Sequence, residues 1–220
     1  DQTPGTYRGT IALDSNQGHL GAVNIALTVV DVALPAQRHF PAHVGFYEHH
    51  IARMYELEPD SAAFQEIFKH YIEFFLKNRL DPRTPPAMQG RIEKGKYILS
   101  GPRPELEQLF LEHERVQFLI SPVPQGIPGP GREEPFSETY QGYVRQHVAQ
   151  VIAHARQNGW YERLVFWMPI DEPKSQIQYE AVRRWADLIR AVDPEVRVSV
   201  TEQPKTENPA WGSLVGHVNA

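Results

Sequence analysis

From about residue 36 onward, short apolar runs alternate with longer amphipathic stretches, and this alternation restricts the possible folds more than any other feature. The clearest apolar runs cover residues 116–120, 164–170 and 196–200. The amphipathic stretches cover residues 63–77, 137–158 and 178–192, and their apolar side chains recur at helical spacing. Strands that alternate with helices of this length form parallel βαβ units. We therefore expect an α/β sheet or barrel.

Weaker patterns complete this region. A proline-containing strand is expected within residues 36–46, another strand over residues 91–99, a helix over residues 104–114, and the start of a further strand over residues 214–219. That makes five or six strands, whereas a (β/α)₈ barrel has eight strands in about 250 residues. The prediction is an incomplete (β/α)₈ TIM-like barrel, with residues 36–220 as the N-terminal part of a catalytic domain.

The first 35 residues have a different pattern. Two β-type runs, residues 7–13 (YRGTIAL) and 23–34 (VNIALTVVDVAL), flank a polar stretch at residues 14–21 (DSNQGHLG). This arrangement predicts a hairpin. We expect residues 1–35 to be the C-terminal part of an all-β, sandwich-type domain.

Composition narrows the functional classes. With 220 residues, 41% of them hydrophobic and 22% charged, the chain can bury a core. A formal charge of -5 without a Lys/Arg cluster argues against a nucleic-acid partner. No apolar stretch reaches the roughly 18–20 residues of a membrane span. Cysteine is absent, which excludes disulfides, thiolate metal sites and a cysteine nucleophile.

Two adjacent carboxylates, Asp171 and Glu172, follow the apolar run at residues 164–170 and precede Pro173. The carboxyl ends of barrel strands converge on one face, where barrel enzymes hold their catalytic groups. Ser121 and Gln125, after another strand, would share that face. The structural alternative is that the acids begin the next helix, since acids are favoured near a helix N-terminus and proline in its first turn.

The spacing of the two acids limits the chemistry. Glycoside hydrolysis needs a proton donor beside the leaving oxygen and a second group at the anomeric carbon. Adjacent residues of an extended segment point in different directions, so Asp171 and Glu172 do not easily flank a sugar ring. They fit substrate assistance better, in which a 2-acetamido oxygen attacks while one acid donates a proton and the other orients the amide. We expect Glu172 to lie in a partly apolar setting beneath Trp167 and Met168.

Four segments together resemble glycoside hydrolase family 123 and its uncharacterised relatives: GTYRGTIAL, VNIALTVVDVALP, a strand ending in IDEP, and VRVSVTEQP. The resemblance covers nearly the whole chain. It implies retaining hydrolysis of a terminal β-linked N-acetylhexosamine, chiefly N-acetylgalactosamine, within a glycan. It further implies Glu172 as general acid/base, Asp171 as the group that positions the acetamido nitrogen, no cofactor, and a secreted or periplasmic location.

Further residues are candidates for contacting substrate. Glu202 follows the strand at residues 196–200 and is either a sugar contact or the partner of Glu172 in a conventional retaining pair. Trp167 is either a core residue or a stacking platform, and Trp211 either stacks on sugar or packs internally. Tyr47 is grouped with Glu48, His49 and His50; adjacent histidines are not a recognised metal-ligand spacing, so a substrate or surface role is preferred and no metal is predicted.

The predicted barrel leaves two further points to interpret, a loop rich in proline and glycine and the possibility of a role without catalysis. The loop at residues 121–135 (SPVPQGIPGPGREEP) lacks the Lys-Ser/Thr signature of a phosphate cradle and is expected to form a rim of the substrate entrance. A barrel fold does not guarantee activity, so a non-catalytic carbohydrate-binding barrel remains the alternative from another functional class.

Overall fold

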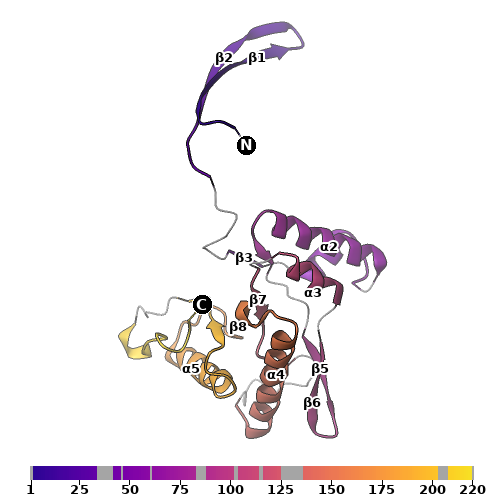
Figure 1. Ribbon diagram of the computed structural model, residues 1–220, viewed down its shortest axis with the longest axis vertical. Helices are drawn as coiled ribbons and strands as arrows, with labels where there is room; N and C mark the ends of the chain where they lie inside the picture. Colours follow the sequence, from indigo (N-terminus) through magenta and orange to yellow (C-terminus); the bar gives the residue numbers. More distant parts are fainter. Residues whose placement is uncertain are drawn as a thin grey trace. The chain divides into compact units, whose positions relative to one another are not determined.

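The computed structural model describes residues 2–33, 42–45, 47–59, 61–82, 88–101, 104–113, 116–124, 136–202 and 208–219 (Figure 1). The chain divides into two compact units, Asp1–Arg38 and His39–Ala220, and each is described by itself. Gln125 and most of the predicted rim loop lie outside the described residues, as do parts of the strand predicted within residues 36–46.

The first unit is the predicted hairpin, drawn in indigo in Figure 1. Strands β1 (Gly5–Ser15) and β2 (Gly18–Val29) pair antiparallel. The predicted polar stretch at residues 14–21 is mostly strand, and only residues 16–17 form the turn. The Ser15 hydroxyl explains the tight turn, because it donates to the Gly18 carbonyl (3.3 Å) and accepts from the Gln17 amide (3.1 Å). One face of the ribbon is apolar, as strand alternation requires, with Tyr7, Ile11, Val23, Ile25 and Leu27 all exposed.

The second unit contains the predicted parallel strands. Strands β7 (Phe118–Ile120), β8 (Leu164–Trp167) and β9 (Arg197–Ser199) form one parallel sheet in that order. Helix α4 (Glu138–Gln157) connects β7 to β8, and α5 (Gln176–Arg190) connects β8 to β9. The two predicted βαβ units are thus present. Each strand is shorter than its apolar run, and the flanking residues Val116, Met168 and Val196 are buried although they lie outside the strands.

A second parallel pair joins β3 (His43–Val44) to β4 (Asp81–Pro82). Helices α1 (Glu48–Met54) and α2 (Ala62–Lys77) lie between these strands in sequence, and α3 (Pro104–Leu111) precedes β7. Ser61 caps α2 by accepting from the Phe64 amide (3.2 Å). In the described residues the sheets are small and mixed with helices, and they do not form a closed barrel.

The single strand predicted over residues 91–99 is wrong, because this segment is the hairpin β5 (Gln89–Glu93) and β6 (Lys96–Gly101). Lys94 and Gly95 turn the chain with φ of 49° and 76°, the left-handed conformation that two-residue hairpin turns require. The hairpin lies beside α4 (Figure 1), and Tyr97 is buried at the contact.

The core lies between the strands and the inner faces of the helices. Phe118 of β7 stacks on Trp160 with ring centroids 4.2 Å apart. Gly159 follows Asn158, the C-cap residue of α4, with φ of 74°. The apolar side chains that recur at helical spacing in α4 and α5 are buried, among them Val144, Val148, Val151, Val182 and Ile189. Within the described residues, no helix combines the length and apolar character that a bilayer crossing requires.

Candidate functional site

The acid pair lies in the loop between β8 and α5. After β8 ends at Trp167, the Met168 amide still donates to the Ser199 carbonyl (2.9 Å), so the pairing with β9 extends one residue further. Helix α5 begins only at Gln176, capped by Ser175. Asp171 and Glu172 therefore precede the helix and its cap, and the structural alternative that they begin the helix is wrong.

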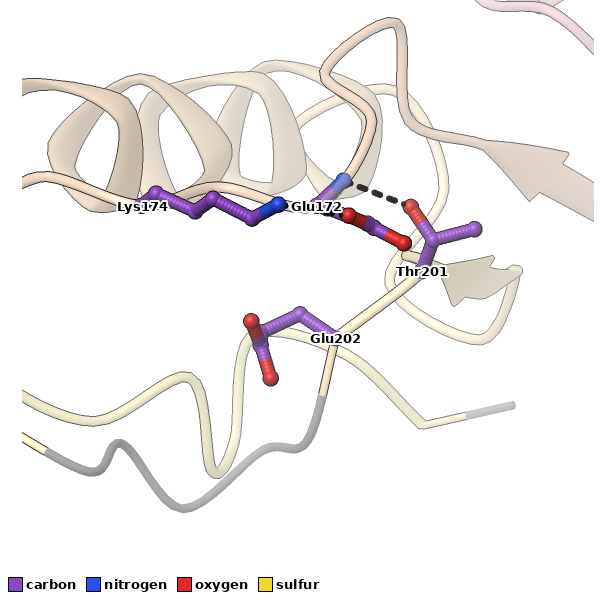
Figure 2. A pocket seen from close by; sticks show the side chains of 4 residues that line it. All are labelled: Glu172, Lys174, Thr201 and Glu202. Carbon is purple, nitrogen blue, oxygen red and sulfur yellow. Dashed lines mark hydrogen bonds and ion pairs between the residues drawn. The ribbon is translucent and has the colours of Figure 1, made fainter.

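Thr201, just after β9, joins both acids. Its hydroxyl oxygen accepts from the Glu172 amide (2.8 Å; Figure 2) and donates its proton to Asp171 Oδ1 (2.6 Å). An amide can only donate and a carboxylate can only accept, so the direction of both bonds is fixed. The ends of two neighbouring parallel strands are thereby linked through one side chain.

The backbone at Glu172 is left-handed, with φ of 43°. The other described non-glycine residues with positive φ have local reasons: Glu56 and Arg79 follow helix C-caps and Lys94 is in a hairpin turn. Glu172 instead precedes Pro173, a position that normally favours an extended backbone. The assumption that both acids lie on an extended segment is therefore wrong.

Lys174 contacts the Glu172 side chain. Its Nζ donates to Glu172 Oε2 (2.7 Å), and both side chains are exposed, at 73% for Lys174 and 62% for Glu172. The hydrogen bond to Glu172 raises the pKa of Lys174, and the charges of Glu172, Glu202 and Asp171 add to this effect. Met168 is buried but Glu172 is not, so the expected apolar setting for Glu172 is wrong.

A pocket of about 420 Å³ is lined, among the described residues, by Glu172, Lys174, Thr201 and Glu202. Figure 2 shows Glu172 and Lys174 on the loop before α5, and Thr201 and Glu202 on the segment after β9. The volume falls in the range of small-molecule sites. The carboxylates and the ammonium group of this lining suit a ligand rich in hydroxyl and amide groups. Sequence reasoning brought Glu172 and Glu202 together, but it missed Lys174, two residues after Glu172, and the bridging role of Thr201.

The other predicted contact residues are not among the described residues that line this pocket. Tyr47 is the exposed N-cap residue of α1, with the rings of His49 and His50 at 5.6 and 5.4 Å. Trp167 is half-buried in β8. Trp211 lies in the short 3₁₀ helix Pro209–Trp211, packed at 5.5 Å from the Tyr179 ring. In the described part of the chain, no three His, Asp or Glu side chains are grouped so that they could hold a metal.

Comparison with known proteins identifies the fold. No protein-family model matches the sequence, and no curated protein matches it. A solved structure of a family 123 glycoside hydrolase from Clostridium perfringens, described in connection with glycolipid glycan hydrolysis, is similar with a TM-score of 0.65 at 14% identity, over 98% of this chain and 44% of that one. A family 39 glycoside hydrolase from Bacteroides cellulosilyticus WH2 has a TM-score of 0.41 at 13% identity, over 90% of this chain and 38% of that one. The chain spans less than half the length of either protein, and its fold is similar to part of a glycoside hydrolase.

Proposed function

We propose that this chain is part of a glycoside hydrolase that cleaves terminal β-linked N-acetylhexosamine, with N-acetylgalactosamine as the preferred sugar. The observation that carries the proposal is the pairing of Asp171 and Glu172, through Thr201, at the carboxyl ends of β8 and β9 beside a pocket of about 420 Å³. Barrel enzymes hold their catalytic groups at this end of the strands. In this proposal residues 36–220 belong to a (β/α)₈ barrel that follows the last strands of a β-sandwich.

The proposed reaction is retaining and substrate-assisted. Glu172 protonates the glycosidic oxygen while the acetamido oxygen of the substrate attacks the anomeric carbon, which breaks the bond to the leaving group. Asp171 accepts a hydrogen bond from the acetamido N–H and so orients the amide. Water then opens the cyclic intermediate as Glu172 takes up its proton, and the configuration is retained. No cofactor takes part in this scheme.

The remaining contacts belong to the same proposal. Glu202, which lines the pocket, binds sugar hydroxyls. Tyr47, Trp167 and Trp211 contribute aromatic surface to the substrate, for which sugar rings are suitable partners. The packing of Trp211 against Tyr179 limits it to the face that this contact leaves accessible. A glycan substrate is consistent with a secreted or periplasmic protein.

A second candidate mechanism is supported by one specific observation: Glu172 and Glu202 line the same pocket from two different segments (Figure 2). In a conventional retaining glycosidase two carboxyl groups about 5–5.5 Å apart act as acid/base and nucleophile. That mechanism would cleave sugars without an acetamido group. A non-catalytic glycan-binding protein would instead bind sugars with or without an acetamido group and hydrolyse neither.

The test is to compare Glu172→Gln and Asp171→Asn on substrates with poor and with activated leaving groups. Loss of the proton donor should lower kcat on poor leaving groups by about 10²–10⁴-fold and spare activated ones in part. Asp171→Asn should slow both kinds, because orientation of the nucleophilic amide is needed in each. Glu180→Gln, on the exposed surface of α5, is the matched control and should be silent. Equal, slight effects of the two acid substitutions would contradict the assignment.

A further inference from the structure

One hydroxyl group organises two separate parts of the acid pair. Thr201 Oγ1 accepts a hydrogen bond from the backbone amide of Glu172 (2.8 Å) and donates one to Asp171 Oδ1 (2.6 Å). The first bond fixes where the Glu172 backbone turns, and the second fixes which way the Asp171 carboxylate faces. Both bonds cross from the end of β9 to the loop after β8, so neither arises from local sequence.

The loop needs such a restraint. A left-handed φ of 43° is unfavourable for a residue with a Cβ, and the following proline adds to the cost. A conformation of this kind persists only when its surroundings hold it. The bond from the Glu172 amide to Thr201 is a tertiary contact of the kind that can hold it. The Lys174 contact cannot replace it, because it is exposed and involves only the Glu172 side chain.

Threonine is well suited to form both of these hydrogen bonds. A hydroxyl both accepts and donates, which an amide donor and a carboxylate acceptor demand together. The branched Cβ of threonine restricts χ1, so the hydroxyl is presented in few orientations. The bond occupies Asp171 Oδ1, and Oδ2 is then the oxygen assigned to the acetamido N–H of the substrate.

We infer that Thr201 is a positioning residue for the acid pair, which sets the Asp171 carboxylate and the Glu172 backbone in the arrangement needed for turnover. The inference rests on the proposed function, since positioning has a catalytic meaning only if Asp171 and Glu172 act on substrate. In this role Thr201 acts through Asp171 and Glu172, and no bond to substrate is assigned to it.

The experiment uses the full chain with Thr201→Val, which replaces the hydroxyl by a methyl group of similar shape, and Thr201→Ser, which keeps it. Thr10→Val is the matched control, because Thr10 also donates a side-chain hydrogen bond, to Asn24, but belongs to the hairpin β1–β2. Two quantities are measured for each variant: amide hydrogen exchange at Glu172, and kcat and KM on an aryl β-N-acetylgalactosaminide. Circular dichroism confirms that each variant is folded.

For Thr201→Val we expect faster exchange at the Glu172 amide and a fall in kcat of about 10–100-fold, since misplacement of reacting groups by about 1 Å has effects of this size. KM should change less than kcat, because the contacts assigned to Glu202 and to the aromatic side chains are not altered. Thr201→Ser should restore most of the slow exchange at the Glu172 amide and most of kcat. Thr10→Val should match the wild type in both quantities.

Each contrary outcome has a distinct meaning. Unchanged exchange at Glu172, or accelerated exchange with unchanged kcat, would overturn the inference. If the protein of which this chain is part hydrolyses no aryl glycoside, the proposed function is overturned; accelerated exchange in Thr201→Val would then still identify Thr201 as the residue that holds the loop, without a catalytic role.

Discussion

At the scale of single residues, Glu172 combines an unusual backbone conformation with the proposed role of proton donor. Its backbone is held by Thr201 and its carboxylate by Lys174. The Lys174 contact adds little stability, because exposed ion pairs lose most of their attraction to solvent. Its consequence is chemical: the bond to Glu172 keeps the Lys174 amine protonated to higher pH, since it raises the pKa of Lys174.

This arrangement predicts the reactivity of Lys174. Amine reagents attack the neutral amine, so at pH 9 Lys174 should react more slowly than Lys94, which is exposed in the β5–β6 turn. Glu172→Gln removes the negative partner and should speed labelling at Lys174 while leaving Lys94 unchanged. Mass spectrometry of the labelled peptides measures both rates in one sample. Equal rates at Lys174 in the wild type and in Glu172→Gln would show that the ion pair does not form.

At the scale of elements, the β5–β6 hairpin is attached to α4 by hydrogen bonds to side chains of the helix. Gln150 Oε1 accepts from the Leu99 amide (2.8 Å), and Gln150 Nε2 donates to the Tyr97 carbonyl (2.8 Å). The Tyr97 hydroxyl donates to His147 Nδ1 (2.8 Å), and His147 Nε2 donates to the Ser121 carbonyl (3.0 Å). Burial lowers the pKa of His147 to about 4 and raises that of Tyr97 to about 12, so His147 stays neutral and Tyr97 stays a donor.

The buried histidine predicts a loss of stability in mild acid. The unfolded chain takes up a proton near pH 6.5, whereas folded His147 does so only near pH 4. The contribution of neutral His147 to the free energy of unfolding is therefore fully present above about pH 6.5. It is lost progressively as the pH falls to 4, and the loss is about 2 kcal/mol at pH 5. Urea unfolding at pH 7.5 and pH 5 measures the difference.

His147→Gln should flatten this dependence, because a glutamine amide can still accept from Tyr97 and donate to Ser121 but does not titrate. His70→Gln is the control, as His70 is exposed on α2 and should leave the pH dependence unchanged. An identical pH dependence in the wild type and in His147→Gln would show that this histidine is not the titrating group.

Helical spacing predicted α2, α4 and α5 to within a few residues, because a buried stripe leaves a strong periodic pattern. The lengths of the parallel strands β7, β8 and β9 were overestimated, since an apolar run marks burial and not ladder pairing, whereas β1 is longer than predicted. The β5–β6 hairpin was missed because its turn is only two residues long, Lys94 and Gly95, and because charged residues on both sides weaken the strand pattern.

The sequence predicted at which strand ends the candidate residues lie, but not the backbone conformation or the exposure of Glu172. Parallel βαβ units require the segments after β8 and β9 to meet, and so Glu172 and Glu202 line one pocket. The left-handed backbone of Glu172 and its link to Thr201 depend on contacts between residues about 30 positions apart, which no local pattern encodes. Periodicity likewise said nothing about the exposure of the Glu172 side chain.

At the scale of the whole molecule, two units with different architecture follow each other in the chain. The apolar face of the β1–β2 ribbon is exposed within its own unit, and an apolar strand face of this kind supports the proposed β-sandwich assignment. The parallel strands and their connecting helices support the proposed barrel. The likeness to the family 123 glycoside hydrolase extends over 98% of this chain, so it includes both units.

The most direct test of the central claim is hydrolysis of three aryl glycosides by the full chain and by Glu172→Gln: a β-N-acetylgalactosaminide, a β-N-acetylglucosaminide and a β-galactoside. We predict cleavage of the acetamido sugars alone, fastest for the galactosaminide, with turnover lost in Glu172→Gln when the leaving group is poor. Equal cleavage of the plain β-galactoside would contradict substrate assistance and favour the pair Glu172 and Glu202. Cleavage that is unaffected by Glu172→Gln would contradict the site itself.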